Sequence, residues 1–170
     1  MNNLHIKTLL TILTIITSFS IVTRGASAAG SLDMQIERAI VKALKDYNGA
    51  MSENNPASWL KYFDKNAVRT DPISGSIKGL ENITSYYSQE FSLFKASLEI
   101  QRVMLKERTG AVEMVWQASH NSTETIISLP MVGIFELAPS GKFKSATFYF
   151  DTAMNNNVKI KAIIEQLKMP

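Results

Sequence analysis

The chain has 170 residues, of which 45% are hydrophobic and 19% are charged. This length corresponds to one domain, and the composition provides enough apolar surface for a packed core, so a folded, soluble domain is expected rather than a disordered chain. The sequence contains no cysteine, which excludes disulfides, thiolate catalysis and cysteine-based metal sites.

The first 28 residues have the pattern of a secretory signal peptide. Lys7 precedes an uncharged run from Thr8 to Thr23, and small residues follow at positions 26–28. This run is shorter than the roughly 20 residues that a membrane-spanning helix needs. We therefore expect cleavage after Ala28, export to the periplasm or the medium, and no stable membrane insertion of the mature domain, residues 29–170. An N-terminal anchor that is not cleaved is the alternative.

Removal of this leader leaves a nearly neutral protein. Lys7 and Arg24 are lost while no acidic residue is, so the net charge falls from +3 to about +1. The sequence has no basic cluster with interleaved aromatic residues, so a nucleic-acid partner is not expected.

The first half of the domain is predicted to be mainly helical. Apolar residues recur there at steps of three and four positions, which is the period of an amphipathic helix. The expected elements are a helix over residues 31–50 that starts at Ser31, a short helix from Pro56 to Phe63, a strand over 67–71, turn residues over 74–79, and a helix over 80–94.

The second half is predicted to be mainly strands, because hydrophobic residues beyond Ala96 recur at every second position. The expected elements are strands over residues 98–105, 112–116, 126–137 and 143–150, and a last helix over 157–168. Helices followed by an antiparallel meander predict an α+β domain. A curved antiparallel sheet packed against three helices would enclose a conical cavity between them.

The segment Ala67–Tyr87, AVRTDPISGSIKGLENITSYY, resembles the stretch around the catalytic Asp-Pro of bacterial ketosteroid isomerases, which belong to the SnoaL-like or nuclear-transport-factor-like superfamily. In this segment Asp71-Pro72 follows a predicted strand, and Gly79 opens the next helix. Tyr47 lies 24 residues before Asp71, the spacing of that family. The strand motif Glu113–Trp116 also resembles the family.

The resemblance covers residues 33–152 and implies a fold and an assembly. The fold would be the cone-shaped, cystatin-like α+β barrel of the nuclear-transport-factor-like proteins. A homodimer is implied through the exposed face of the sheet, where alternate apolar residues would otherwise meet water.

The resemblance also implies residue roles. Asp71 would be the base that moves a proton between two carbons of a steroid enone, and Tyr47 would donate a hydrogen bond to the developing oxyanion. Tyr87 corresponds to a tyrosine that supports this donor, and a further supporting tyrosine falls on Phe63. The second donor, a protonated aspartic acid, aligns with Gly133. Loss of such a donor typically costs roughly 10²- to 10³-fold in rate, so weak activity is expected.

The chemistry requires an apolar pocket, because desolvation keeps a carboxylate from behaving as an ordinary solvated acid. The side chains expected to form this pocket are Phe63, Phe91, Met114, Trp116 and Phe148. Proton transfer between carbons needs no cofactor and no metal, and the sequence lacks glycine-rich phosphate loops and metal-ligand spacings. His120, the one histidine of the mature chain, is expected in a solvated hairpin.

Other interpretations stay open. An aspartate before proline often caps its own turn, and Tyr47, Met114 and Trp116 can be ordinary core residues. The leading hypothesis is an exported isomerase that acts on a small hydrophobic, steroid-like carbonyl compound. The alternatives are a non-catalytic binding module for such a ligand and another cofactor-free enzyme of the superfamily, such as a cyclase, a dehydratase or an epoxide hydrolase.

Overall fold

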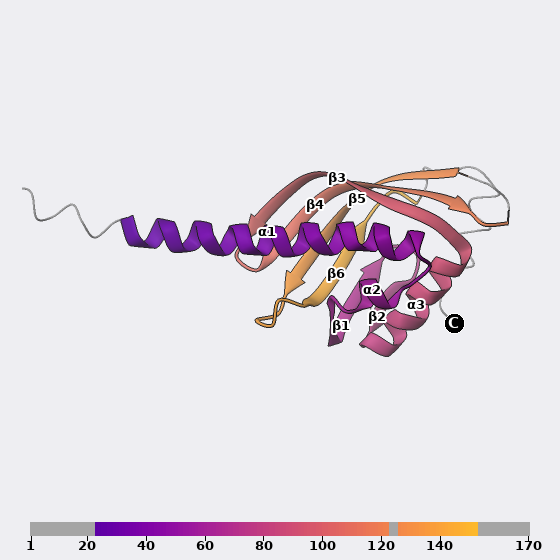
Figure 1. The fold of residues 1–170 in the computed structure, drawn as a ribbon, viewed down its shortest axis with the longest axis horizontal. Helices are drawn as coiled ribbons and strands as arrows, with labels where there is room; N and C mark the ends of the chain where they lie inside the picture. The colour runs from indigo at the N-terminus through magenta and orange to yellow at the C-terminus, as the bar shows by residue number, and fades with distance from the viewer. Residues whose placement is uncertain (1–22, 123–125, 153–170) are drawn as a thin grey trace, which may run out of the picture. The chain divides into compact units, whose positions relative to one another are not determined.

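The computed structural model describes residues 23–122 and 126–152 (Figure 1). These described residues fall into two separate units, residues 23–32 and the described residues from 33 onward. The described part of the first unit is helical, and the candidate functional residues belong to the second unit. The predicted last helix, residues 157–168, and most of the predicted leader lie outside the described residues.

Helix α1 runs from Thr23 to Ser52 and is longer than the predicted helix over residues 31–50. The prediction that the helix begins at Ser31 is wrong, because the helix already includes residues 23–30, which contain three alanines and no proline that would interrupt it. Among the described helices, none is long and apolar enough to cross a membrane.

Within the described part of the second unit, six strands form one curved sheet in the order β2-β1-β6-β5-β4-β3 (Figure 1). The strands are β1 (Phe63–Asp71), β2 (Gly75–Lys78), β3 (Phe94–Lys106), β4 (Thr109–His120), β5 (Ile126–Leu137) and β6 (Phe143–Tyr149). Strands β3 to β6 form the predicted antiparallel meander. Strand β1 pairs parallel with β6 and antiparallel with β2. The α+β prediction is therefore confirmed, with a parallel pairing that was not predicted.

The region around Asp71 is more extended than the sequence predicts. The second helix, α2, covers only Ala57–Leu60, and Phe63 is the first residue of β1 instead of the end of that helix. The residues expected as a turn include β2, in which Gly75 pairs with Asp71. Gly75 has a φ of 68°, a conformation that glycine adopts without strain. This tight reversal allows β2 to pair with β1 and fixes Asp71 at the end of its strand.

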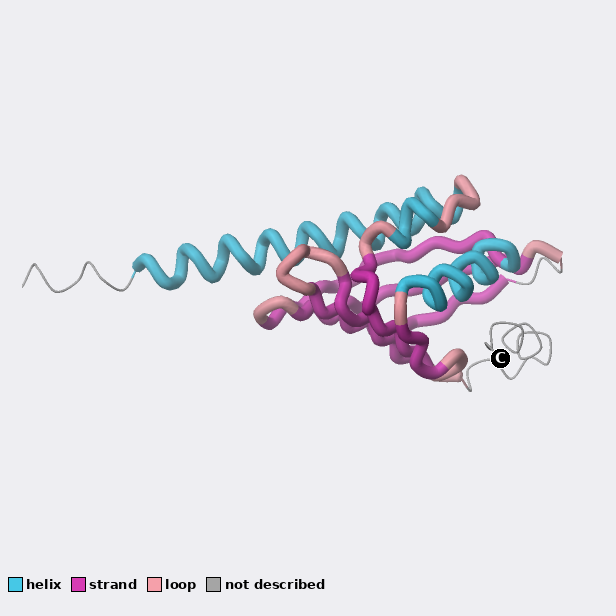
Figure 2. The backbone as a smooth tube through the Cα atoms, turned by 90° about the horizontal axis from the view of Figure 1, so that it is seen from below, coloured by secondary structure: helices cyan, strands magenta, loops and turns pink. Residues whose placement is uncertain are grey.

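Within the second unit, helix α3 and the part of α1 from residue 33 to residue 52 lie alongside the strands (Figure 2). Helix α3, Leu80–Leu93, packs against β1, β2 and β3. Near the end of α1, the side-chain amide of Asn48 donates to the carbonyl oxygen of Leu98 at 2.9 Å, and its side-chain oxygen accepts from the N–H of Leu98 at 2.7 Å. These two bonds join α1 to β3 and position the neighbouring Tyr47 over the sheet.

An aromatic core connects these elements. The ring of Trp59 lies 5.2 Å from that of Phe63, 5.9 Å from that of Phe143 and 5.8 Å from that of Tyr87, measured between centroids. All four residues are buried, and burial of one such apolar side chain contributes roughly 1.5–3 kcal/mol. The core therefore holds Trp59 and Tyr87 in fixed orientations.

Candidate functional site

A cavity of about 70 Å³, partly open to solvent, lies among β1, the helices α1 and α3, and the inner face of the meander. Its polar groups are Tyr47, Arg69, Asp71, Tyr86, Tyr87 and Glu90. Its apolar groups are Leu44, Trp59, Ile73, Leu98, Trp116, Leu129, Met131, Phe148 and Phe150. A mainly apolar wall with a few converging polar groups is the usual form of a small-molecule site.

The size of the cavity limits what it can hold. An apolar cavity of roughly 150 Å³ holds benzene, and sites for drug-sized molecules measure roughly 300–1,000 Å³. At about 70 Å³, this cavity admits a functional group or part of one ring. A four-ring steroid does not fit inside it unless side chains of the wall move.

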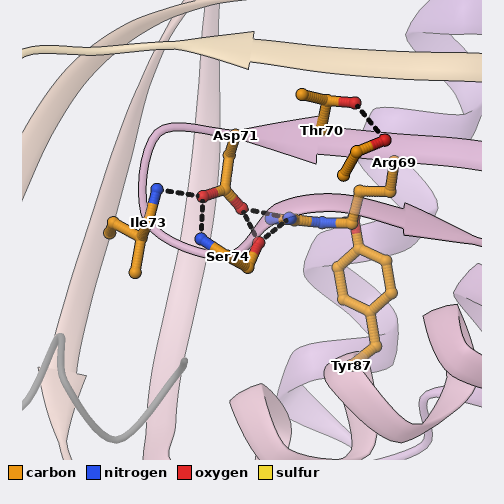
Figure 3. Close-up of polar contacts among 7 residues, drawn as sticks. Arg69, Thr70, Asp71, Ile73, Ser74 and Tyr87 are labelled. Carbon is orange, nitrogen blue, oxygen red and sulfur yellow. Dashed lines mark hydrogen bonds and ion pairs between the residues drawn. The ribbon is translucent and has the colours of Figure 1, made fainter. Parts of the chain in front are cut away.

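Asp71 lies at the end of β1 with its carboxylate surrounded by donors (Figure 3). One oxygen, Oδ1, accepts the backbone N–H groups of Ile73 at 2.6 Å and Ser74 at 2.8 Å. The other, Oδ2, accepts the Ser74 hydroxyl at 2.6 Å and forms an ion pair with Arg69. Asp71 thus caps its own turn, as the simpler interpretation of the sequence predicts, and it also lines the cavity.

These partners favour the ionised form of Asp71. Burial alone would raise the pKa of its carboxyl, but the charge of Arg69 and the hydrogen bonds from Ser74 and Arg69 lower that pKa below its ordinary value. Asp71 is therefore an anion at neutral pH. A carboxylate with a lowered pKa is a weak base, because proton transfer is most efficient when the pKa of the base lies near the working pH.

Arg69 is buried two positions before Asp71 on the same strand. Its guanidinium carbon lies 3.8 Å from the ring centroid of Tyr86 and 5.1 Å from that of Phe148. Its Nε donates to the Tyr87 hydroxyl at 3.3 Å and its Nη1 to the Ser74 hydroxyl at 3.0 Å. Aromatic faces and an ion pair together compensate the desolvation of this cation.

Tyr47 and Glu90 form a second buried pair. The Tyr47 hydroxyl donates to Oε1 of Glu90 at 2.6 Å and accepts from Nε1 of Trp116 at 3.0 Å. In this arrangement the proton of Tyr47 points to Glu90, so Tyr47 donates to a ligand oxygen only after this hydrogen bond is exchanged.

Burial dominates the acid–base behaviour of this pair. It raises the pKa of Tyr47 well above its ordinary value, and the Glu90 charge adds to the effect. Burial also raises the pKa of Glu90, although the charge of Arg69 and the hydrogen bond from Tyr47 oppose this shift. The cavity therefore contains two carboxyl groups whose environments move their pKa values in opposite directions.

The structure brings some of the predicted site residues together and not others. Those on the cavity wall are Tyr47, Asp71, Tyr87, Trp116 and Phe148. Those that are buried elsewhere and do not line the wall are Phe63, Phe91, Met114 and Gly133. The prediction of a solvated His120 is wrong, because this residue is buried at the end of β4 against the ring of Phe94.

Gly133 has no room for the acid that the resemblance would place there. A Cβ atom at this position would lie 2.5 Å from Cε of Met114 and 2.7 Å from the ring of Phe135. The space that a second oxyanion donor would need is thus filled by core side chains. In this structure the second carboxyl group of the cavity comes from α3 instead.

Sequence reasoning missed Arg69, Tyr86 and Glu90, although each had a detectable signal. Residues two apart on a strand share a face, so an inward-facing Asp71 requires an inward-facing Arg69. Glu90 follows Ile83 by seven positions and Tyr86 by four, which places it on the buried face of the predicted helix. A charged residue on such a face is a candidate for a functional site.

Among the residues that the structure describes, no three histidine or acidic side chains come together as a metal site. The groups able to exchange a proton inside the cavity are the two carboxyls and the tyrosine hydroxyls. The arrangement is therefore suited to hydrogen bonding and proton transfer with a largely apolar ligand.

Comparison with known proteins agrees with this fold. A family model described as a SnoaL-like domain matches residues 44–146, more than half of the chain. No curated protein matches the sequence.

Several solved structures share the fold. A protein with a ketosteroid isomerase-like fold from Catenulispora acidiphila, in complex with trimethylamine, is 15% identical with a TM-score of 0.57, covering 65% of this chain and 85% of its own. The epoxide hydrolase/cyclase-like enzyme SalBIII, which has a role in pyran ring formation in the polyether salinomycin, is 14% identical with a TM-score of 0.62. The match covers 71% of this chain and 93% of SalBIII. A Mycobacterium tuberculosis protein in complex with estradiol-17β-hemisuccinate is 13% identical with a TM-score of 0.59. The match covers 68% of this chain and 96% of that protein. At these identities the likeness concerns the fold alone.

Proposed function

The chain belongs to the SnoaL-like domain family, and on that premise we propose that it is a cofactor-free enzyme that moves a proton within a small hydrophobic carbonyl compound, an isomerase-type reaction. The observation that carries this proposal is the presence of two buried carboxyl groups, Asp71 and Glu90, on the wall of one mainly apolar cavity. Abstraction of a proton from carbon requires a desolvated base and a hydrogen-bond donor for the oxygen that becomes negative. Both types of group are present.

In the roles that the resemblance implies, Asp71 is the base and Tyr47 is the donor. The hydrogen bonds and ion pair of Asp71 weaken it as a base, and the proton of Tyr47 is directed to Glu90. A slow reaction is therefore expected from these two residues alone.

The ligand should be hydrophobic and should place an oxygen function inside the cavity. The M. tuberculosis protein of the same fold binds a steroid ester, which supports a hydrophobic ligand here. The cavity volume of about 70 Å³ admits a functional group or part of one ring, so it favours a small compound over a four-ring steroid. A larger molecule would have to leave part of its skeleton outside the opening.

We further propose that the protein acts after export and as a homodimer. The signal-like leader supports export. The face of the sheet opposite the cavity supports a dimer, because it carries the exposed side chains of Met104 and Tyr149. Sedimentation of the purified protein at several concentrations tests the dimer, and a monomer at every concentration contradicts it.

The enzymatic proposal is tested with β,γ-unsaturated ketones of increasing size: cyclohex-3-enone, a two-ring analogue and a 5-ene-3-ketosteroid. Formation of the conjugated enone is followed by ultraviolet absorbance. We expect turnover above the buffer rate, greatest for the smaller ketones, and lower turnover in the Asp71→Asn variant. Turnover equal to buffer for every ketone would refute the proposal.

A binding module is the second candidate, and the hydrogen bonding of the site favours it. The carboxylate of Asp71 and the hydroxyl of Tyr47 already have partners within the protein. Such a site can hold a ligand without reacting with it. Binding of these ketones with no incorporation of deuterium from heavy water into the bound compound would identify this function.

Another cofactor-free enzyme of the superfamily, such as a cyclase or an epoxide hydrolase, is supported by the second acid. Glu90 lines the same cavity as Asp71, which provides the acid and the base that opening of an epoxide ring requires. Hydrolysis of small cyclic epoxides, measured beside the ketone assay, distinguishes this reaction from isomerisation.

A further inference from the structure

We propose that Glu90, rather than Asp71, is the catalytic base of this cavity, and that its protonation releases Tyr47 to stabilise the oxyanion. This inference rests on the proposed function and assigns its proton transfer to a residue outside the resemblance. It is carried by the buried Tyr47–Glu90 hydrogen bond at the cavity wall.

The two carboxyl groups differ in what holds them. Asp71 accepts two backbone N–H groups and a hydroxyl and pairs with Arg69, and each of these partners loses a favourable interaction if Asp71 takes up a proton. Glu90 lies on the rigid helix α3 and is 5% exposed. Glu90 also accepts the Tyr47 hydroxyl and is stabilised by the charge of Arg69, but the desolvation of its carboxylate outweighs these contacts and favours uptake of a proton.

The reaction balances within the site. Ionised Glu90 takes a proton from the carbon next to the ligand carbonyl, the C–H bond breaks, and an O–H bond forms on Glu90. The electron pair moves to the carbonyl oxygen and gives an enolate. Glu90 then returns the proton to a different carbon of the same ligand, which regenerates the carboxylate and completes the isomerisation without any co-reactant.

Tyr47 couples these two steps. While Glu90 is ionised, it is the strongest acceptor available to the Tyr47 hydroxyl, which it binds at 2.6 Å. Hydrogen bonds to ionised acceptors are roughly twice as strong as those between neutral groups. When Glu90 becomes neutral and the enolate oxygen becomes negative, the stronger acceptor is the ligand, so Tyr47 turns to it. Trp116 keeps the hydroxyl in place through its Nε1 at 3.0 Å.

The pH dependence of the reaction separates the two acids. The titratable and charged groups that face Glu90 are Tyr47 of α1, Arg69 and Asp71 of β1, and Tyr86 and Tyr87 of α3 itself. Burial and these surroundings together raise the pKa of Glu90 above its ordinary value of 4.5. The pKa of Asp71 is lowered from 3.8. A carboxyl group acts as a base only when it is ionised, so kcat/KM rises with pH around the pKa of the base. The midpoint of this rise lies above pH 4.5 if Glu90 is the base, and below pH 3.8 if Asp71 is the base.

The test compares the full chain with its Glu90→Gln variant, which keeps size and hydrogen bonding but cannot accept the proton. Glu81→Gln is the matched control, since it changes an exposed glutamate in the first turn of the same helix. Isomerisation of cyclohex-3-enone is measured against pH. We expect Glu90→Gln to lower kcat/KM by about 10²- to 10⁴-fold, the usual contribution of a general base, and Glu81→Gln to leave it unchanged.

A second readout does not depend on turnover. Infrared difference spectra of the wild-type protein between pH 4 and pH 8 should show a neutral carboxyl band that titrates above 4.5. The band should disappear in Glu90→Gln, whereas in Asp71→Asn it should remain and titrate at a lower pH than in the wild type. If Glu90→Gln does not fold, Glu90→Asp takes its place and is expected to keep measurable activity with a shifted pH profile.

The outcomes are distinct. If Glu90→Gln retains the wild-type rate and profile while Asp71→Asn is inactive, the inference is overturned and the isomerase proposal stands. If the wild-type protein binds the ketone but does not convert it, both the isomerase proposal and the inference are overturned. An unchanged rate and profile in Glu90→Asp, where that variant is used, also overturns the inference.

Discussion

Asparagine at position 71 keeps the shape of the aspartate but removes its charge, so Arg69 is left as a buried cation without its partner. The side chains of Arg69 and Asp71 are 7% and 1% exposed, and removing one partner of such a pair costs about 3–5 kcal/mol. Asparagine still offers an oxygen to the backbone N–H groups of Ile73 and Ser74, so the loss should lie near 3 kcal/mol. For a chain of this size each kcal/mol lowers Tm by about 2–4 °C, which gives a decrease of roughly 6–12 °C.

Thermal and urea unfolding of Asp71→Asn, Arg69→Met and the double variant measures this loss. The double variant should cost less than the sum of the two single variants, since it leaves no unpaired charge. Thr70→Ala is the control, because Thr70 faces away from the pair on the same strand (Figure 3), and it should change stability by less than about 0.5 kcal/mol. A loss below 1 kcal/mol in Asp71→Asn, or strict additivity, would refute the assignment of a buried ion pair.

Two further predictions concern stability. Gly133→Ala should cost about 1–3 kcal/mol by overpacking, because its Cβ would meet Met114 and Phe135 at 2.5 and 2.7 Å; equal urea midpoints for variant and wild type would contradict this. The pKa of Glu90 is higher in the folded protein than its ordinary value of 4.5, so with rising pH this side chain ionises in the unfolded chain before it ionises in the folded one. The wild type therefore loses stability as pH rises from 4.5 through the folded-state pKa. Glu90→Gln lacks this loss, so the Tm of the variant minus that of the wild type should increase as pH rises through this range. A Tm difference that does not change with pH would contradict the raised pKa of Glu90.

The antiparallel strands β3 to β6 could be predicted because the signal for each strand lies within its own sequence. Residues on β3 to β6 alternate between the core and the opposite face, and this alternation is visible in the sequence. Strand β2 has one buried residue, Ile77, among exposed glycine, serine and lysine, so it carries no such pattern. It becomes a strand through its pairing with β1, which is a tertiary effect.

The site shows the same distinction between local and tertiary information. Tyr47 and Asp71 line one cavity, in agreement with the placement that the family resemblance implied. The contact between Tyr47 and Glu90 could not be predicted from the sequence, because the two residues lie 43 positions apart. Only the packing of α3 and α1 on the sheet brings the two side chains into contact. Arg69 is different, since strand alternation alone was sufficient to place it beside Asp71.

Asp71 also influences the reaction through the pKa of Glu90, without exchanging a proton itself. Arg69 alone would stabilise the ionised form of Glu90 and lower its pKa, whereas the negative charge of Asp71 raises it. Asp71 thus keeps Glu90 basic by neutralising the arginine that both acids share. In Asp71→Asn the rise of kcat/KM with pH should therefore move to lower pH than in the wild type, while Thr70→Ala leaves it in place. If the profile of Asp71→Asn coincides with that of the wild type, the two acids are not coupled and Asp71 has only its structural role in the turn.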